Sequence, residues 1–251
     1  LLEERQEKQV IEAELARAST IQKNLIPTEL PHLDGYQIYA YQHQCRAVGG
    51  DLYDVTCLPD GRLLLMLADV SGKGMGAALL MANILASFRV LYRQPQFDPV
   101  TVVGEVSRQL FRYSAPGDFA TLFLGILDPA TNRLHYVNAG HNPPYLMRPD
   151  GGYEELPASG TMIGAFDMMT WSEATAPFGN GDMLCVFTDG VTEAEKEDGE
   201  QYGEDRVVRV LKAHVTEAVA QAGEALVRDV RQFVEGAPQS DDITLLMLKR
   251  E

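Results

Sequence analysis

Hydrophobic and polar positions follow two kinds of pattern along this chain of 251 residues. Short apolar runs between turn residues predict strands, and longer stretches with an apolar residue every three or four positions predict helices. The expected strands are 36–42, 51–58, 62–69, 119–127, 133–137, 144–148, 153–156, 171–176, 183–188 and 242–249, the first three of which fit a meander. The expected helices are 3–26, 77–93, 98–112, 203–213 and 217–235.

These elements come in blocks: strands, a helix pair, strands, a second helix pair and a last strand. A doubly wound parallel sheet would alternate strand and helix regularly. Segregated blocks favour the α+β class, with largely antiparallel sheets and helices on the outside.

Residues 1–30 form a candidate linker or switch helix that precedes a globular domain over 31–251. Apolar residues make a stripe along it in alternating four- and three-residue steps: Ile11, Leu15, Ala18 and Leu25. Gln22 interrupts the stripe, and Pro27 ends the helix. Two interpretations stay open: a helix docked on the domain, or the end of a coiled coil that joins two copies as a homodimer. Because the chain begins in mid-helix without Met, we expect a longer protein with an upstream sensor domain.

Composition narrows the class of protein. The chain is 45% hydrophobic, which is enough for a sizeable core, and its formal net charge is −15. Such an acidic chain is a poor partner for nucleic acid or for an anionic membrane surface. The cysteines Cys45, Cys57 and Cys185 are scattered without metal-type spacing, which predicts reduced thiols in the cytoplasm. No apolar run is long enough to predict a membrane span in this segment.

Aspartates stand at the ends of the most apolar strands. Asp69 and Asp189 each follow an apolar run, and Asp241-Asp242 precedes one. If neighbouring strands are antiparallel, the end of one strand lies beside the start of the next. We therefore expect these carboxylates to meet at one rim of a sheet.

A fourth aspartate follows from the symmetry of a turn. Asp51 opens one strand, Asp69 ends the next, and the turn residue Asp60 is the midpoint between them. In a regular hairpin centred there, Asp51 and Asp69 face each other on one side of the sheet.

Crowded carboxylates need a counter-charge. Two unit charges about 4 Å apart repel by roughly 4 kcal/mol at an effective dielectric near 20. No basic run in the sequence lies near these aspartates, so a hard divalent cation with oxygen ligands is the natural neutraliser. We therefore predict a site for Mn²⁺ or Mg²⁺, with two ions. The alternative is four unrelated aspartates, since Asp is common at strand ends and turns.

Three further residues lie in segments that suggest chemistry. Lys73 belongs to a glycine-rich turn that lacks the glycine spacing of a phosphate-binding P-loop. Arg46 precedes Asp51 and fits a phosphate bidentately, the alternative being an ordinary surface arginine. His141 lies in an irregular loop, where a hydrogen-bonded structural histidine is the more common case.

Five motifs, in order, resemble those of SpoIIE/RsbU-type phosphatases, bacterial relatives of the metal-dependent PP2C (PPM) serine/threonine phosphatases. They are Val48-Gly49-Gly50-Asp51-Leu52-Tyr53-Asp54, Ala68-Asp69-Val70-Ser71-Gly72-Lys73-Gly74, Asn138-Ala139-Gly140-His141-Asn142-Pro143-Pro144, Phe187-Thr188-Asp189-Gly190-Val191-Thr192-Glu193 and Ser240-Asp241-Asp242-Ile243-Thr244. The resemblance covers residues 31 to 249, and the ordered set is far more specific than any one motif.

The resemblance implies an α-β-β-α sandwich, in which two antiparallel sheets are flanked by helices and metal ions lie at one end. The residues that it implies as ligands, and hence as catalytic, are Asp51, Asp69, Asp189 and Asp241, with the backbone carbonyl of Val70. Asp69 would bridge two metals, and Asp242 is the alternative to Asp241. Ser71 stands where eukaryotic members have a histidine as general acid. Many bacterial relatives have a histidine where this chain has Lys73, a candidate for substrate binding together with Arg46.

The implied activity is hydrolysis of phosphoserine or phosphothreonine in a protein by metal-activated water, without a covalent enzyme intermediate. The implied setting is the output domain of a bacterial signalling protein. Its substrate would be an anti-anti-sigma (STAS-type) regulator. Two alternatives stay open: a catalytically silent module that binds a regulator, and a structural metal-binding domain.

Overall fold

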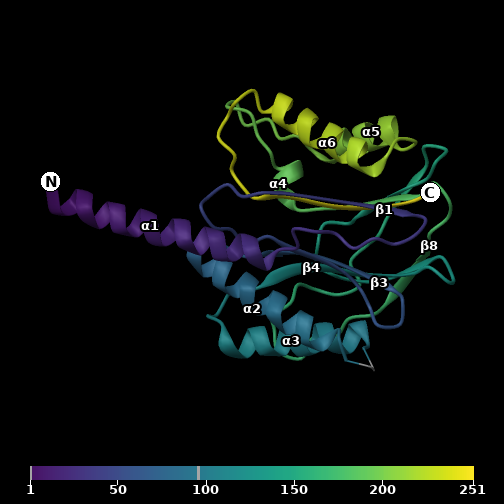
Figure 1. Ribbon diagram of the computed structural model, residues 1–251, viewed down its shortest axis with the longest axis horizontal. Helices are drawn as coiled ribbons and strands as arrows, with labels where there is room; N and C mark the ends of the chain where they lie inside the picture. Colours follow the sequence, from purple (N-terminus) through teal and green to yellow (C-terminus); the bar gives the residue numbers. More distant parts are fainter. Residues whose placement is uncertain (1, 95–96) are drawn as a thin grey trace.

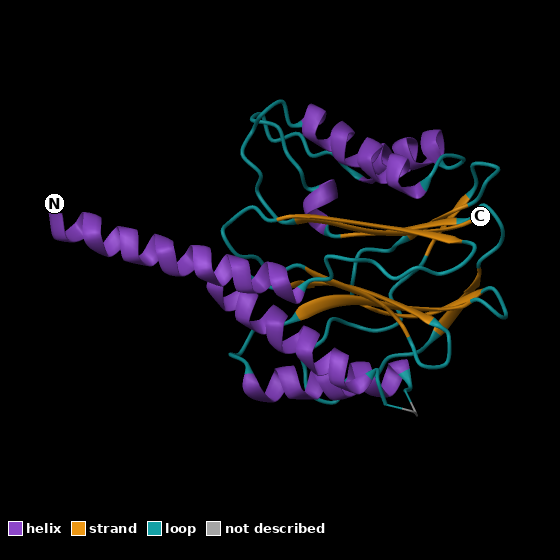
Figure 2. Ribbon diagram, viewed as in Figure 1, coloured by secondary structure: helices purple, strands orange, loops and turns teal. Residues whose placement is uncertain are grey.

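Residues 2–94 and 97–251, which the computed structural model describes, fold into two antiparallel β-sheets that lie face to face. Helices cover the outer face of each sheet (Figure 1, Figure 2). The layers are helices, sheet, sheet, helices, so the predicted α-β-β-α sandwich of the α+β class is confirmed. Within the described residues, no helix has both the length and the apolar character that crossing a membrane requires.

The first sheet has the strand order β1-β10-β9-β6-β7. The bounds are β1 Tyr36–His43, β10 Ile243–Arg250, β9 Met183–Phe187, β6 Tyr145–Met147 and β7 Tyr153–Glu155. Along β10, Leu246 and Leu248 pack between the sheets, whereas Leu245 and Met247 pack under the covering helices. Burial on both faces explains why this strand reads as an unbroken apolar run.

The second sheet has the strand order β2-β3-β4-β5-β8. The bounds are β2 Leu52–Cys57, β3 Leu63–Val70, β4 Ala120–Asp128, β5 Arg133–Ala139 and β8 Ala174–Pro177. The β2–β3 hairpin is centred on Asp60, because Leu52 pairs with Ala68 and Cys57 with Leu63. The predicted register of this hairpin is therefore correct.

Helices α2 (Met75–Leu91) and α3 (Pro99–Tyr113) lie on the second sheet, and α5 (Glu204–His214) and α6 (Val219–Phe233) lie on the first (Figure 1). Helix α3 starts where an Asp-Pro pair predicts a start: the Asp98 carboxylate accepts the N–H of Thr101 at 2.7 Å. Helix α1 (Leu2–Leu25) extends away from the sandwich, with only its C-terminal part beside the domain (Figure 1).

The predicted meander of the first three strands is wrong. Strand β1 pairs with β10 in the first sheet, whereas β2 and β3 belong to the second. The segment 44–51 therefore crosses from one sheet to the other. Apolar periodicity cannot distinguish the two arrangements, because it reports which face is buried and not which strand lies alongside. The short helix α4 (Asp189–Thr192), directly after β9, was also not expected.

Candidate metal centre

Asp51 and Asp69 lie side by side at one end of the β2–β3 hairpin. Leu52 pairs with Ala68, which places Asp51 opposite Asp69 one step further along. The two carboxyl groups are close enough for the charge of Asp69 to raise the pKa of Asp51. The predicted cross-strand pair of aspartates is therefore confirmed.

Two threonines of the first sheet orient the Asp51 carboxylate. Thr188 Oγ1 donates to Asp51 Oδ2 at 2.8 Å, and Thr244 Oγ1 donates to the same oxygen. Thr188 follows β9 and Thr244 belongs to β10, so these bonds connect the two sheets at Asp51. Neither threonine was predicted as a site residue, although each stands within two residues of an aspartate in its motif.

Burial raises the pKa of the Asp51 carboxyl well above its usual range, and repulsion from Asp69 raises it further. The hydrogen bonds from Thr244 and Thr188 act in the opposite direction. Burial also raises the pKa of Asp69 to about 7, and the charge of Asp189 adds to the effect. Carboxyl groups with such pKa values lack a counter-charge, which a bound divalent cation would provide.

Asp189 is the first residue of α4, directly after β9. Burial raises the pKa of its carboxyl, and the charges of Glu193 and Asp241 raise it further. The backbone N–H of Gly190 partly offsets these effects by donating to the carboxylate. Asp189 therefore shares the electrostatic situation of Asp69.

The prediction that the carboxylates meet at the rim of one sheet is wrong. Asp69 belongs to β3 of the second sheet, whereas Asp189 follows β9 and Asp241 precedes β10 of the first. They interact because the ends of the two stacked sheets lie together. The charges of Asp189 and Asp241 both raise the pKa of the Asp69 carboxyl. The site is thus built across the sandwich.

The neighbours Asp241 and Asp242 have different surroundings. Asp242 is 4% exposed, and its two oxygens accept the N–H groups of Cys45 at 2.8 Å and Gly50 at 3.1 Å. Asp241 instead faces Lys73, whose Nζ lies 2.7 Å from Asp241 Oδ2. Because both Asp242 oxygens already accept backbone N–H groups, Asp241 is the better candidate ligand.

The backbone carbonyl of Val70 packs against Gly50. A Cβ on Gly50 would lie 2.7 Å from the Val70 carbonyl oxygen, so a side chain at position 50 would displace this carbonyl or cover it. This carbonyl follows Asp69 directly in the chain and completes a donor set made of oxygen atoms alone. Carboxylate and carbonyl oxygens are the ligands that Mg²⁺ and Mn²⁺ prefer, so the residues present fit these ions.

Two basic residues lie together at the glycine-rich turn. Besides its ion pair with Asp241, Lys73 Nζ donates to the Ser240 carbonyl at 2.7 Å. Arg46 is exposed, and its Nη1 lies 3.8 Å from the position of a Cβ on Gly74. A cation therefore does reach the acidic cluster, which the sequence analysis did not expect.

A second group of possible metal donors lies beside this cluster. Cys45, Asp241 and Asp242 each offer a ligand atom within 4.8 Å of the others. The Asp242 oxygens are occupied by backbone N–H groups, and burial raises the pKa of the Cys45 thiol to about 11. A protonated thiol is a poor ligand, so this group is a weaker candidate than the carboxylates.

His141 has the structural role that its loop position suggested. Its ring nitrogens lie 2.9 Å from Thr121 Oγ1 and 3.0 Å from the Phe187 carbonyl oxygen. Burial lowers the pKa of His141 to about 4, so the ring is neutral near neutral pH. Thr121 pairs with Asp69 across β3 and β4, so His141 supports the site without entering it.

The stacked sheets and the acidic end define a domain of the PP2C-like fold. The solved SiaA-PP2C domain of Pseudomonas aeruginosa has the same fold, with a TM-score of 0.84 at 23% identity over 97% of this chain and 98% of that chain. The chain belongs to the SpoIIE family, since the family model described as Stage II sporulation protein E matches residues 59–251. The resemblance read from the five motifs is thereby confirmed.

Two curated relatives extend this similarity. Protein IcfG of Synechocystis sp. is 29% identical over 269 residues, which cover 94% of this chain and 41% of that protein. Phosphoserine phosphatase RsbU of Bacillus subtilis is 26% identical over 247 residues, which cover 97% of this chain and 72% of that protein. The chain therefore spans less than half the length of IcfG.

Proposed function

We propose that this chain is a metal-dependent serine/threonine protein phosphatase domain that hydrolyses phosphoserine or phosphothreonine in a protein. The observation that carries the proposal is the convergence of Asp51, Asp69 and Asp189 from both sheets, with raised carboxyl pKa values. Membership of the SpoIIE family and similarity to a phosphoserine phosphatase support the same reaction.

Two Mn²⁺ or Mg²⁺ ions would be held by Asp51, Asp69, Asp189, Asp241 and the carbonyl of Val70. When bound, the ions supply an acidic water molecule and positive charge that stabilises the phosphoryl oxygens. Thr188 and Thr244 fix the orientation of Asp51, and Asp242 fixes the backbone of Cys45 and Gly50 on the way into β2. These contacts pre-form the ligand positions before an ion arrives.

Arg46 and Lys73 form the substrate side of the proposed site. A guanidinium binds a phosphate through two parallel hydrogen bonds, and an ammonium adds a mobile point charge. Lys73 Nζ pairs with Asp241 at 2.7 Å, and with Asp241 as a metal ligand the Lys73 ammonium would be available to the substrate phosphate. Ser71 has a structural role in this proposal: its hydroxyl accepts the backbone N–H of Phe119 at 3.0 Å.

The substrate and partners are inferred by analogy with the relatives. An anti-anti-sigma regulator of the STAS type is the proposed phosphoprotein, and the chain would be the output domain below a sensor domain. Helix α1 would join two such chains through its exposed apolar residues, which include Val10 and Ile11 at 59% and 57% exposure. This arrangement places the phosphatase under the control of an upstream signal.

Hydrolysis of para-nitrophenyl phosphate tests the proposal. Turnover should require Mn²⁺, should stop with EDTA, and should be absent in Asp189→Asn. A folded protein with no turnover, and with no rise in melting temperature on addition of Mn²⁺, would contradict it. That outcome would favour the catalytically silent module that binds a regulator.

A further inference from the structure

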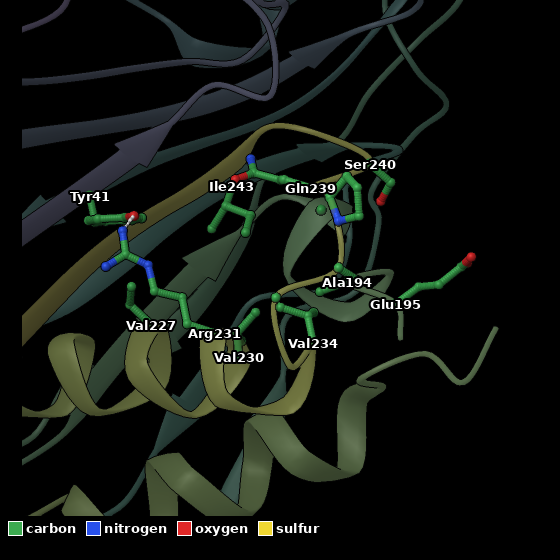
Figure 3. A pocket seen from close by; sticks show the side chains of 14 residues that line it. Tyr41, Ala194, Glu195, Val227, Val230, Arg231, Val234, Gln239, Ser240 and Ile243 are labelled. Carbon is green, nitrogen blue, oxygen red and sulfur yellow. Dashed lines mark hydrogen bonds between the residues drawn. The ribbon is translucent and has the colours of Figure 1, made fainter. Parts of the chain in front are cut away.

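A cavity of about 290 Å³ lies between α6 and the segment that leads into β10 (Figure 3). Val227 and Val230 of α6 and Val234 directly after it form one wall, and Ala194 and Ile243 lie across from them. The lining is mainly apolar. The volume is at the small end of the range for ligand pockets, and concave apolar cavities with few polar groups are typical of such sites.

Arg231 provides the charge at one end of this cavity. Its guanidinium donates to the Tyr41 hydroxyl at 2.7 Å and lies 5.7 Å from the centre of the Tyr41 ring. Among the residues that the structure describes, no carboxylate forms an ion pair with Arg231, although the chain has a net charge of −15. Glu195, the acidic residue of the rim, points away from the cavity (Figure 3). An anionic group at this end would therefore meet the Arg231 guanidinium, while the Glu195 carboxylate is directed away from it (Figure 3).

The cavity wall continues into both strand ends that carry candidate ligands. Gly190, next to Asp189, and Ser240, next to Asp241, both line it. Gln239 lines it too, and its Nε2 donates to the carbonyls of His43 at 2.9 Å and Asp241 at 2.6 Å. A molecule in the cavity would thus contact the segments that position two of the carboxylates.

We propose that this cavity is an effector site for a small molecule with an apolar body and one anionic group, coupled to the metal centre; the coupling rests on the proposed function. The apolar body fills the space between the valines of α6 and Ile243, and the anionic group pairs with Arg231. Because Gly190, Gln239 and Ser240 form part of the wall, occupancy changes the affinity of the neighbouring carboxylates for metal. By reciprocity, metal changes the affinity for the effector by the same factor.

Anilinonaphthalene sulfonate, an aromatic molecule with one anionic group, is the probe for binding. Its fluorescence should show saturable binding to the protein. Ala237, in the loop after α6, also lines the cavity, and Ala237→Phe should remove this binding by filling the space. Arg231→Gln should weaken binding roughly two- to fivefold, as expected for an exposed charge pair. Arg228→Gln, an exposed arginine of the same helix outside the cavity, is the matched control and should leave binding unchanged.

Equal binding in the parent protein, Ala237→Phe and Arg231→Gln would overturn the proposal, because the probe would then lie elsewhere. A change of oligomeric state in Ala237→Phe would overturn it as well, since the cavity would then be an interface between copies. Circular dichroism confirms that each variant is folded. The binding experiment needs no phosphatase activity, so its outcome is independent of the test of the proposed function.

The coupling is measured by thermal denaturation. The Mn²⁺ concentration that gives half of the full rise in melting temperature is determined with and without saturating probe. We expect a shift of about fivefold or more in the parent protein, the lower end of typical allosteric coupling, and none in Ala237→Phe. An unchanged Mn²⁺ midpoint with bound probe would overturn the effector assignment.

Discussion

His141 Nε2 lies 3.0 Å from the backbone carbonyl oxygen of Phe187 and so connects the loop after β5 of one sheet to β9 of the other. A carbonyl oxygen only accepts, so Nε2 carries the proton and Nδ1 accepts from the Thr121 hydroxyl at 2.9 Å. Phe187 precedes Asp189 by two residues, and Thr121 pairs with Asp69. One neutral imidazole therefore supports the strand ends that carry two candidate ligands.

The neutral state of His141 predicts a loss of stability in acid. Burial lowers its pKa from 6.5 to about 4, so between these values the unfolded chain binds more protons than the folded one. The contribution is fully present above pH 6.5 and is lost as pH falls toward 4, for a total of about 3 kcal/mol. Melting temperatures from pH 7.5 to 5 should fall more steeply in the parent protein than in His141→Gln, which does not titrate.

His135 provides the matched control, since it is half-buried and pairs with Glu173 at the surface. His135→Gln should keep the acid-dependent slope of the parent protein. Identical slopes in the parent protein and His141→Gln would mean that other groups control stability in this range of pH.

Replacing Asp69 should separate folding from metal binding. Burial and the charge of Asp189 both disfavour the ionised form of the Asp69 carboxyl. Asp69→Asn should therefore stabilise the metal-free protein by roughly 1–3 kcal/mol at pH 8. The same variant should lose phosphatase activity and the rise in melting temperature that Mn²⁺ causes. Thermal denaturation in EDTA and in Mn²⁺ measures both effects. Asp34→Asn, whose side chain is 99% exposed, should change neither.

A structural carboxylate in the motif of Asp51 should behave in the opposite way. Asp54 is 4% exposed, accepts two hydrogen bonds from Arg89 at 2.9 Å each, and accepts a third from the Tyr92 hydroxyl at 2.8 Å. Asp54→Asn leaves the arginine without its charge partner and should cost about 3–5 kcal/mol in urea unfolding. The exposed pair of Asp60 and Arg62 is the comparison: Asp60→Asn should cost less than about 1 kcal/mol. Equal costs would contradict the buried-pair interpretation.

The sequence predicted those features of the site that depend on local order. The position of Asp51 opposite Asp69 follows from one symmetrical turn, and the helix start at Asp98 follows from one dipeptide. The oxygen-donor chemistry likewise follows from residue types at strand ends. These are short-range relationships, which periodicity and turn chemistry encode.

The remainder depends on contacts between distant residues. Assignment of β1 to the first sheet is decided by its pairing with β10, whose paired residues lie at least 200 positions away. The bonds from Thr188 and Thr244 to Asp51, and the occupation of Asp242 by backbone N–H groups, arise only when two sheets stack. Periodicity shows that a face is buried but not what covers it, so these partners had no sequence signal of their own.

Lys73 should compete with metal for Asp241. Lys73→Gln removes the ammonium 2.7 Å from Asp241 Oδ2, so the Mn²⁺ midpoint in thermal denaturation should fall roughly two- to fivefold. The same variant should raise KM for a phosphopeptide, because a phosphate-binding charge is lost. Arg46→Gln should raise KM but leave the Mn²⁺ midpoint unchanged. An equal or higher Mn²⁺ midpoint in Lys73→Gln would contradict the competition.

Gln22 is the contact through which α1 should affect the metal centre. It is 4% exposed; its Nε2 donates to the Gly49 carbonyl at 2.6 Å, and its Oε1 accepts the Gly49 N–H at 3.1 Å. Gly49 and Gly50 lead into Asp51, so loss of these bonds should leave buried peptide groups unpaired at about 1–3 kcal/mol each and displace that carboxylate. Gln22→Met should therefore weaken Mn²⁺ binding and lower phosphatase activity, measured by Mn²⁺ titration of melting temperature and turnover. Ile21→Ala, at a position 56% exposed on the same helix, should leave both unchanged. Parent-like Mn²⁺ binding in Gln22→Met would mean that α1 does not act through this contact.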